Sequence, residues 1–297
     1  MRIFVTGATG FIGSAVVAEL LGAGHQVLGL ARSDSAADAL ARAGAEAHRG
    51  ELVDLDSLAA GARACDGVAH LAFIHDFSKY QENGDIDRRA VTTMADALEG
   101  SGKPFVITSG TALIAPGRTV TEDDAATSDN PSVVRAPSEE VTLAAADRGV
   151  RSSVVRLSPS VHGPGDYAFV PALIDIARRT GVAAYVGEGT NRWSAVHRLD
   201  AARLFRLALE KAAPGTRLHG VAEEGIAVCA IAEAIGEGLG VPVRSITEDE
   251  AAAQFDWLAH FVVIDAPASS AITRETVGWQ PQENGLLKDM RESGYFS

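Results

Sequence analysis

The chain has 297 residues, which suffices for one large domain or two closely associated ones. Hydrophobic residues make up 46% and charged residues 22%, as in an ordinary globular protein. The formal net charge of -13 argues against non-specific binding to nucleic acid or to an anionic membrane, although a local basic site for an anionic ligand remains compatible with it.

The first forty residues predict a strand, a helix and a second strand. A β-branched and aromatic run at 2–6 stops at Gly7 and indicates a buried strand. Apolar residues with helical spacing follow over 11–21, and glycines at 22 and 24 end that helix. A second strand is expected at 26–31, and Ser33 is a candidate cap for a helix that runs to about residue 42.

The same alternation continues to about residue 158. Strands are expected at 67–71, 104–108 and 152–157, with helices at 86–98 and 132–147. Nearly continuous apolar strands that alternate with helices indicate an α/β fold, a doubly wound parallel sheet with helices on both faces. Beyond a cluster of proline and glycine at 158–166, helices are expected at 170–179, 201–211 and 228–239.

We therefore expect a nucleotide-binding domain at 1–158 and a smaller mixed substrate-binding region at 159–297, closely packed on it. The cleft between them is the expected ligand site.

Three glycines in the segment TGATGFIG (residues 6–13) predict a dinucleotide site of the Rossmann type. Gly7 permits a tight turn, Gly10 lets the backbone approach a pyrophosphate, and Gly13 lets the helix pack close to the sheet. The pyrophosphate would lie at the helix N-terminus, where free N–H groups favour an anion. The residues expected to hold it are Gly7, Thr9, Gly10, Phe11, Ile12 and Gly13.

Motifs along nearly the whole chain resemble those of the extended short-chain dehydrogenase/reductase family, the NAD(P)-dependent epimerase/dehydratase-like proteins. The glycine segment matches its N-terminal pattern, and DGVAHLA (66–72) resembles its fourth-strand motif. RLSPSVHGPG (156–165) resembles R-x-x-x-V-Y-G-P-G, with His162 where tyrosine is usual. VHRLD (196–200) and VGWQP (277–281) resemble two later motifs. The resemblance implies a cofactor-dependent enzyme.

The end of the second strand favours NADP(H) over NAD(H). NAD-selective sites place an acidic residue there, but this chain has no acid before Asp34. Arg32 and Ser33 are instead suited to a 2′-phosphate, unless Arg32 is simply a solvated surface residue.

The resemblance also assigns residues to the rest of the cofactor. Glu51 and Leu52 match the segment that flanks the adenine, and further residues would lie along the cofactor or near the nicotinamide: Leu71, Ala72, Phe73, Thr108, Ser158 and Ser160.

The catalytic pair of the family is absent. Typical members carry Tyr-x-x-x-Lys on the fifth helix, whereas the matching stretch here runs from Arg135 to Glu139. Arginine cannot donate a proton near neutral pH, and glutamate cannot supply the positive field of lysine. The usual serine position holds Gly110, between Ser109 and Thr111, either of which could polarise a carbonyl.

A substitute proton donor is therefore expected elsewhere. Tyr167, after the Gly-Pro-Gly loop, and His75, after the fourth strand, are the first candidates, and His197 is a further one. For each of them the alternative is a structural hydrogen bond.

The leading functional hypothesis is an NADP(H)-dependent oxidoreductase that reduces a carbonyl or imine of a small organic substrate. The alternatives are a nucleotide-retaining epimerase or dehydratase and a non-catalytic NADP(H) sensor. Several aromatic side chains are candidates for an apolar substrate pocket, and Arg192 and Arg198 for binding an acidic group. The aromatic set is Phe169, Tyr185, Trp193, Trp257 and Phe261.

No metal site is expected, because the eight histidines lack ligand spacing. Two cysteines, Cys65 and Cys229, do not suggest a disulfide framework, and no apolar run is long enough for a bilayer. Without a recognisable signal peptide, a cytoplasmic protein is expected. The family resemblance also makes a homodimer one alternative, formed through the helices predicted at 86–98 and 132–147, and a monomer is the other.

Overall fold

A seven-stranded parallel sheet forms the centre of the computed structural model, which describes residues 1–112, 114–129 and 133–297. All six strand pairings are parallel, which confirms the doubly wound α/β fold expected from the sequence. The strand order is β10 (Thr216–Gly220), β6 (Arg151–Leu157), β5 (Pro104–Gly110), β4 (Gly67–His70), β1 (Arg2–Thr6), β2 (Gln26–Ala31) and β3 (Glu46–Arg49).

Helices cover both faces of this sheet, and each face has its own apolar core. One core includes residues of α1 (Phe11–Gly22), α2 (Asp34–Ala43) and α7 (Arg198–Lys211). The other includes residues of α3 (Leu55–Arg63), α4 (Tyr80–Ala97) and α5 (Ala136–Ala144). Because helices cover both faces of the sheet, nearly every side chain of the short apolar strands β1, β4 and β6 is buried.

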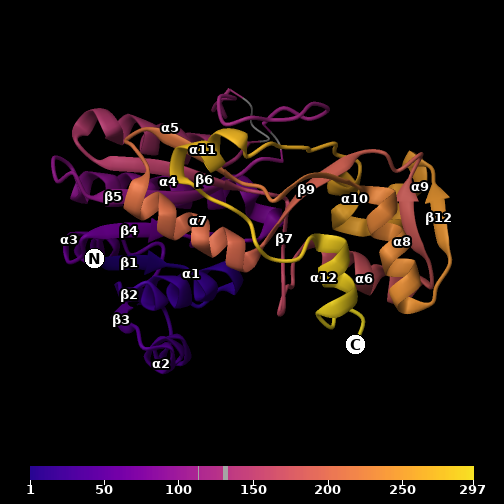
Figure 1. Cartoon of the computed structure of the whole chain (residues 1–297), viewed down its shortest axis with the longest axis horizontal. Coiled ribbons are helices and arrows are strands. Elements are labelled where there is room, and N and C mark those ends of the chain that lie inside the picture. The colour runs from indigo at the N-terminus through magenta and orange to yellow at the C-terminus, as the bar shows by residue number, and fades with distance from the viewer. Residues whose placement is uncertain (113, 130–132) are drawn as a thin grey trace.

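A second lobe lies beside the sheet in Figure 1 and holds most of the C-terminal half. Its apolar core is formed by α6 (Phe169–Thr180), β8 (Ala183–Val186), α8 (Val228–Leu239), β12 (Val243–Ile246), α9 (Glu248–Phe255), α10 (Ala259–Val262) and α12 (Leu286–Glu292). A three-stranded sheet accompanies it, in the order β11 (Glu223–Ala227), β9 (Arg192–His197) and β7 (Ser160–His162).

The main sheet extends beyond residue 158. Strand β10 pairs with β6, and α7 packs against α1 and the sheet, with α11 (Ala271–Val277) beside them. The division at residue 158 therefore stays a prediction, with the qualification that 198–220 lies in the lobe of the main sheet.

Two helices differ most from their predicted bounds, and α7 begins three residues before its predicted start at 201. Helix α4 begins at Tyr80, six residues before the predicted start at 86, because its first turns bury Asn83 and Asp87 through hydrogen bonds rather than apolar contacts. Helix α5 begins at Ala136, with Pro137 in its first turn, and residue 132 lies outside the described residues. Strand β3 was not predicted, because EAHR offers no apolar run.

Among the described residues, no helix combines the length and the apolar character needed to cross a membrane. Cys65 and Cys229 are both free thiols.

Candidate active site

The glycine segment forms a tight turn between β1 and α1 that tolerates no side chain at two of its positions. Gly7 has a φ of +66°, and a Cβ there would lie 2.7 Å from the backbone nitrogen of Ala72. A Cβ on Gly13 would lie 1.9 Å from the carbonyl oxygen of Gly7. The Gly10 N–H donates to that same carbonyl at 3.0 Å, which closes the turn. Glycine is therefore required at positions 7 and 13, because the backbone leaves no room there for a side chain.

The N-terminus of α1 leaves its first N–H groups available. Gly10 caps the helix without a side chain, and no acidic residue lies in the first turn. Uncapped amide N–H groups at a helix start favour an anion, so the turn fits the pyrophosphate of a dinucleotide.

The end of β2 presents an unpaired cation. Arg32 is exposed and makes no hydrogen bond or ion pair within the described part of the chain. The Ser33 hydroxyl caps α2 by accepting the N–H of Ala36 at 3.2 Å. Arg49, in contrast, pairs with Asp34. This exposure fits both expectations for Arg32, a ligand of a 2′-phosphate and a solvated surface residue, so its role stays a prediction.

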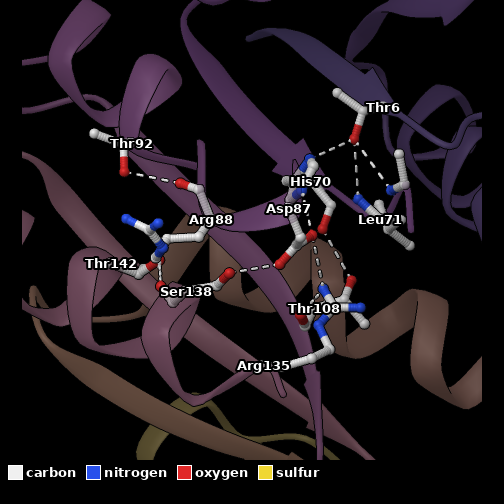
Figure 2. Close-up of polar contacts among 11 residues, drawn as sticks. Thr6, His70, Leu71, Asp87, Arg88, Thr92, Thr108, Arg135, Ser138 and Thr142 are labelled. Atoms are coloured by element: carbon white, nitrogen blue, oxygen red, sulfur yellow. Dashed lines mark hydrogen bonds and ion pairs between the residues drawn. The ribbon is translucent and has the colours of Figure 1, made fainter. Parts of the chain in front are cut away.

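A buried polar network connects β1 to the ends of β4 and β5 (Figure 2). The Thr6 hydroxyl oxygen accepts the N–H groups of Leu71 and Ala72, both at 3.2 Å. Since both of its lone pairs are used, the hydroxyl donates to Nδ1 of His70 at 2.7 Å. The His70 proton therefore sits on Nε2, which donates to Asp87 Oδ1 at 3.1 Å. Hydrogen bonding thus fixes both the tautomer and the orientation of His70.

Asp87 is the centre of this network. Its other oxygen accepts the Ser138 hydroxyl at 2.6 Å, and Arg135 Nη2 lies 3.4 Å from Oδ1. Burial raises the pKa of Asp87, but Arg135, His70 and Ser138 together hold that pKa below its ordinary value. Asp87 is therefore a buried carboxylate that anchors a cation.

Arg135, the residue predicted from motif resemblance to replace the family tyrosine, is held along one side only. Its Nη2 donates to the carbonyl of Thr108, and its guanidinium carbon lies 4.4 Å from the ring centroid of Phe73. Nε is buried without a partner, and no hydrogen bond is recorded for Nη1 in the described residues. The side chain is 14% exposed. A fixed positive charge thus lies at the carboxyl ends of β4 and β5.

Two titratable rings pack around Phe73. Its ring centroid lies 5.2 Å from that of His75 and 6.0 Å from that of Tyr80. Burial, and then Arg135, lowers the pKa of His75, so this imidazole is neutral at pH 7. Burial raises the pKa of Tyr80, so the phenol keeps its proton. We call Phe73, His75, Tyr80 and Arg135 the Phe73 cluster.

Glu139, the residue predicted from motif resemblance to replace the family lysine, forms a buried ion pair with Arg156. Both of its oxygens accept Nε of Arg156, at 3.1 and 3.0 Å, and Oε2 also accepts Nη2 at 2.6 Å. The two side chains are 1% and 0% exposed. This sealed ion pair joins α5 to β6.

The hydroxyl candidates lie at the ends of β5 and β6. Ser109 and Ser160 are buried, and neither hydroxyl has a partner in the described residues. The Thr111 hydroxyl lies 3.5 Å from the carbonyl of Leu157, and Ser158 donates to the carbonyl of Gly220 at 3.0 Å. Thr108 donates to the carbonyl of His70 at 3.0 Å.

The remaining predicted acids make other contacts. Tyr167 is 74% exposed, and its ring lies edge-on to Phe11, 5.9 Å between centroids, beside the glycine turn. His197 caps α7 by accepting the N–H of Leu199 at 3.2 Å, and its ring contacts that of His162. Among the predicted acids, His75 thus lies near Arg135 and Tyr167 lies beside the glycine turn. His197 contacts neither of these two sites in the described part of the chain.

Sequence reasoning missed several residues of the network. His70 carried a signal, a polar side chain inside an apolar strand. Asp87 and Tyr80 lie in a polar stretch whose pattern distinguishes none of its residues. Of the two candidates for the adenine side, Glu51 is exposed and Leu52 is half-buried, and their role stays a prediction.

Four of the five predicted aromatic residues gather in the second lobe. The Phe169 ring contacts those of Trp193, Phe261 and Trp257, at 5.8, 5.0 and 6.0 Å between centroids. Tyr185 packs against the same apolar core but makes none of these ring contacts. No group of three or more metal-ligating side chains occurs among residues 1–112, 114–129 and 133–297.

Comparisons with known proteins agree with this architecture. A sequence profile of the NAD dependent epimerase/dehydratase family matches residues 3–219. An uncharacterized protein of Saccharomyces cerevisiae is 50% identical over 293 residues, covering 98% of each chain. A Stigmatella aurantiaca ketoreductase of 4-hydroxy-2-methyl-3-oxo-4-farnesyl-3,4-dihydroquinoline-1-oxide is 30% identical over 232 residues, 74% of this chain and 67% of the relative.

A solved structure shares the fold over nearly the whole length. The dTDP-glucose 4,6-dehydratase DesIV of Streptomyces venezuelae superposes with a TM-score of 0.78 at 20% identity, covering 98% of this chain and 97% of that one. The resemblance to extended short-chain dehydrogenases/reductases is thereby confirmed, and a nicotinamide dinucleotide is the supported class of cofactor. The chain belongs to the NAD dependent epimerase/dehydratase family.

Proposed function

We propose that this protein is an NADP(H)-dependent reductase that acts on a carbonyl or imine of a small organic substrate. The observation that carries the proposal is Arg135, a guanidinium that Asp87 and Thr108 fix at the strand ends through Nη2, with Nε and Nη1 left without a hydrogen-bond partner among the described residues. A preorganised cation of this kind stabilises negative charge that develops on an oxygen.

The geometry of the glycine turn supports our choice of the residues that would hold the cofactor. The uncapped N-terminus of α1 suits the pyrophosphate, and Arg32 suits a 2′-phosphate. When bound, the nicotinamide supplies a hydride to the carbonyl carbon. The π electron pair then moves to oxygen, where Arg135 compensates the charge.

The structure also suggests how the oxygen is protonated. Tyr80 keeps its proton at neutral pH and lies in the Phe73 cluster with Arg135. We propose Tyr80 as the donor and neutral His75 as a hydrogen-bond donor to the same oxygen. Tyr167 remains the competing donor, because it lies beside the glycine turn. Ser109 and Thr111 remain candidates to bind the carbonyl, and His197 to assist from α7.

The similarity to a ketoreductase supports this choice over epimerisation or dehydration. The test is oxidation of NADPH and of NADH across a panel of ketones, aldehydes and imines, with Tyr80→Phe and Tyr167→Phe compared. We expect turnover with NADPH, lost in Tyr80→Phe and kept in Tyr167→Phe. Tight NADPH binding without turnover of any carbonyl or imine would favour the sensor hypothesis, and cofactor retained through purification without net redox change would favour an epimerase.

A further inference from the structure

The start of α1 is in contact with residues from the second half of the chain. Two side chains lie against the ring of Phe11, the first residue of α1. The Tyr167 ring lies edge-on to it, with 5.9 Å between the centroids, and the guanidinium carbon of Arg198 lies 5.0 Å from its centroid. A tyrosine and an arginine from beyond residue 158 thus lie at the helix end that suits the pyrophosphate.

Arg198 brings a positive charge to this helix end without an ion pair in the described part of the chain. Its Nη1 donates to the carbonyl of Pro164 at 2.9 Å, and its Nε and Nη2 make no hydrogen bond among the described residues. The first turn of α1 holds no acidic residue. Because the dipole of a helix disfavours a cation at its N-terminus, Arg198 and the start of α1 together favour a bound anion.

The loop at 163–167 holds Arg198 against Phe11. The carbonyl that Arg198 binds belongs to Pro164 in this loop, and Tyr167 ends the loop on the same ring of Phe11. Gly163 has a φ of +138°, and a Cβ there would lie 3.1 Å from Cγ of Arg198. Only glycine therefore lets the loop lie this close to Arg198.

The C-terminal segment anchors the 163–167 loop. Figure 1 shows α12 beside β7, and Nδ1 of His162 at the end of β7 lies 2.9 Å from Oδ2 of Asp289 in α12, with both side chains buried. The Tyr295 hydroxyl accepts the N–H of Gly163 and donates to Oδ2 of Asp166, each at 3.0 Å. Burial raises the pKa of Tyr295, so the hydroxyl keeps its proton and donates at neutral pH. Tyr295 therefore bridges the two ends of the loop.

Arg192, the other arginine considered for an acidic group, is already engaged. Its Nε and Nη2 donate to the two carboxylate oxygens of Asp265, at 3.0 and 2.8 Å. Its backbone N–H donates to the same carboxylate at 2.7 Å. Arg198 is therefore the arginine of these two that has donors available for an anion.

We infer that Arg198 binds the pyrophosphate of the cofactor together with the N–H groups at the start of α1, and that Tyr295 is the positioning residue that holds the 163–167 loop beside it. The inference rests on the cofactor part of the proposed function and deepens it, but it does not depend on the reduction of a carbonyl. Because the pyrophosphate is common to NADPH and NADH, Arg198 stabilises both, whereas Arg32 is proposed to distinguish them.

Fluorescence titration of the full chain with NADPH and with NADH, without any substrate, tests Arg198. We expect Arg198→Gln to weaken both nucleotides about tenfold or more and by the same factor, the typical value of a hydrogen bond to a charged group. The affinity of the variant should also fall less steeply with added salt, because one cation is lost. Glutamine keeps an N–H donor for the carbonyl of Pro164. Arg178→Gln is the matched control, because Arg178 pairs with Asp175 on the surface of α6.

Tyr295→Phe tests the positioning role, since it removes the hydroxyl and keeps the ring. We expect both nucleotides to dissociate about threefold faster or more in stopped-flow measurements. In the nucleotide-free protein, hydrogen exchange over residues 163–168 should be faster, because the Gly163 N–H has lost its acceptor. Tyr185→Phe is the matched control, because Tyr185 is a half-buried tyrosine of the second lobe whose hydroxyl makes no hydrogen bond among the described residues. Thermal unfolding checks that each variant folds.

Unchanged affinity for both nucleotides in a folded Arg198→Gln would overturn the inference, and so would a loss confined to one of the two nucleotides. Unchanged dissociation and exchange in Tyr295→Phe would overturn the role of Tyr295.

The same measurements separate this inference from the proposed reductase. If Arg198→Gln weakens both nucleotides but the wild type reduces no carbonyl or imine, the inference stands and the reductase fails. If the wild type reduces a carbonyl with NADPH but Arg198→Gln binds both nucleotides as tightly as the wild type, the reductase stands and the inference fails.

Discussion

Two arginine–carboxylate contacts lie at the start of α5, and they differ in how far the arginine is buried. Glu139 and Arg156 are sealed, with 1% and 0% of their side chains exposed. Arg135 and Asp87 are unequal, since Asp87 is fully buried whereas Arg135 is 14% exposed and has an unpartnered Nε. Motif resemblance predicts both contacts at the positions of the family tyrosine and lysine.

This difference in exposure distinguishes a contact that stabilises the fold from one that is suited to bind a ligand. A sealed pair with saturated geometry stabilises the junction of α5 and β6 and offers nothing to a ligand. The other pair fixes a cation by one side and leaves the other side available, at an edge of the sheet where ligands bind in open α/β folds. Glu139 thus has a structural role, whereas Arg135 is the residue to which we assign a chemical one.

The largest expected effect comes from breaking the sealed pair. Glu139→Ala leaves Arg156 buried without its counter-charge, and we expect the free energy of unfolding to fall by about 3–5 kcal/mol. Urea denaturation measures it. Arg148→Ala is the control, because its pairs with Asp96 and Glu99 are exposed and should contribute far less. Equal losses in the two variants would contradict the structural role assigned to the buried Glu139–Arg156 pair.

The second effect is on catalysis. Arg135→Leu should lower kcat by about 10²–10³-fold, the usual result of removing one donor to a developing oxyanion. Asp87 keeps its bonds to His70 and Ser138, so the fold should survive. Arg135→Lys should recover only part of the rate, since a single ammonium cannot reproduce the planar fork. Steady-state kinetics with NADPH provide the measurement, and a kcat unchanged in Arg135→Leu would remove this residue from the mechanism.

Sequence alone predicted the sheet, its flanking helices and the glycine turn, because apolar periodicity and glycine spacing are local signals. It could not predict that Arg135 is anchored. The anchor is Asp87, which is 48 residues away in the chain and lies in a polar stretch of α4 without a recognisable pattern. The position of Asp87 is in turn supported by His70, whose orientation Thr6 fixes through a hydrogen bond. Tyr80 was missed for the same reason, since only the packing around Phe73 distinguishes it.

A third prediction concerns the cofactor. Arg32→Ala should weaken NADPH binding about tenfold or more, the typical value of a hydrogen bond to a charged group, and leave NADH binding unchanged. Fluorescence titration with both nucleotides measures it. Arg49→Ala is the matched control, because that arginine is already paired with Asp34. Similar affinity of the wild type for both nucleotides would contradict selectivity for NADP(H).

The smallest effect is a pH dependence of stability. The pKa of Asp87 is lower in the folded protein than its ordinary value of 3.8. Its stabilising contribution is therefore complete above that value and is lost as the pH falls through the folded pKa. The stability difference between wild type and Asp87→Asn should shrink as the pH is lowered from about 6 to about 3. A difference that stays constant over this range would show that Asp87 is not held as a carboxylate.

The central claim is that a hydride is transferred to a substrate carbonyl at the strand ends beside Arg135. Its most direct test is NADPH that carries deuterium at the transferred position of C4, incubated with the enzyme and acetophenone. The account predicts 1-phenylethanol with one deuterium on the carbinol carbon, in an amount equal to the NADPH consumed, and its near absence with Arg135→Leu. Product without deuterium, or no alcohol from any carbonyl tested despite bound NADPH, would contradict it.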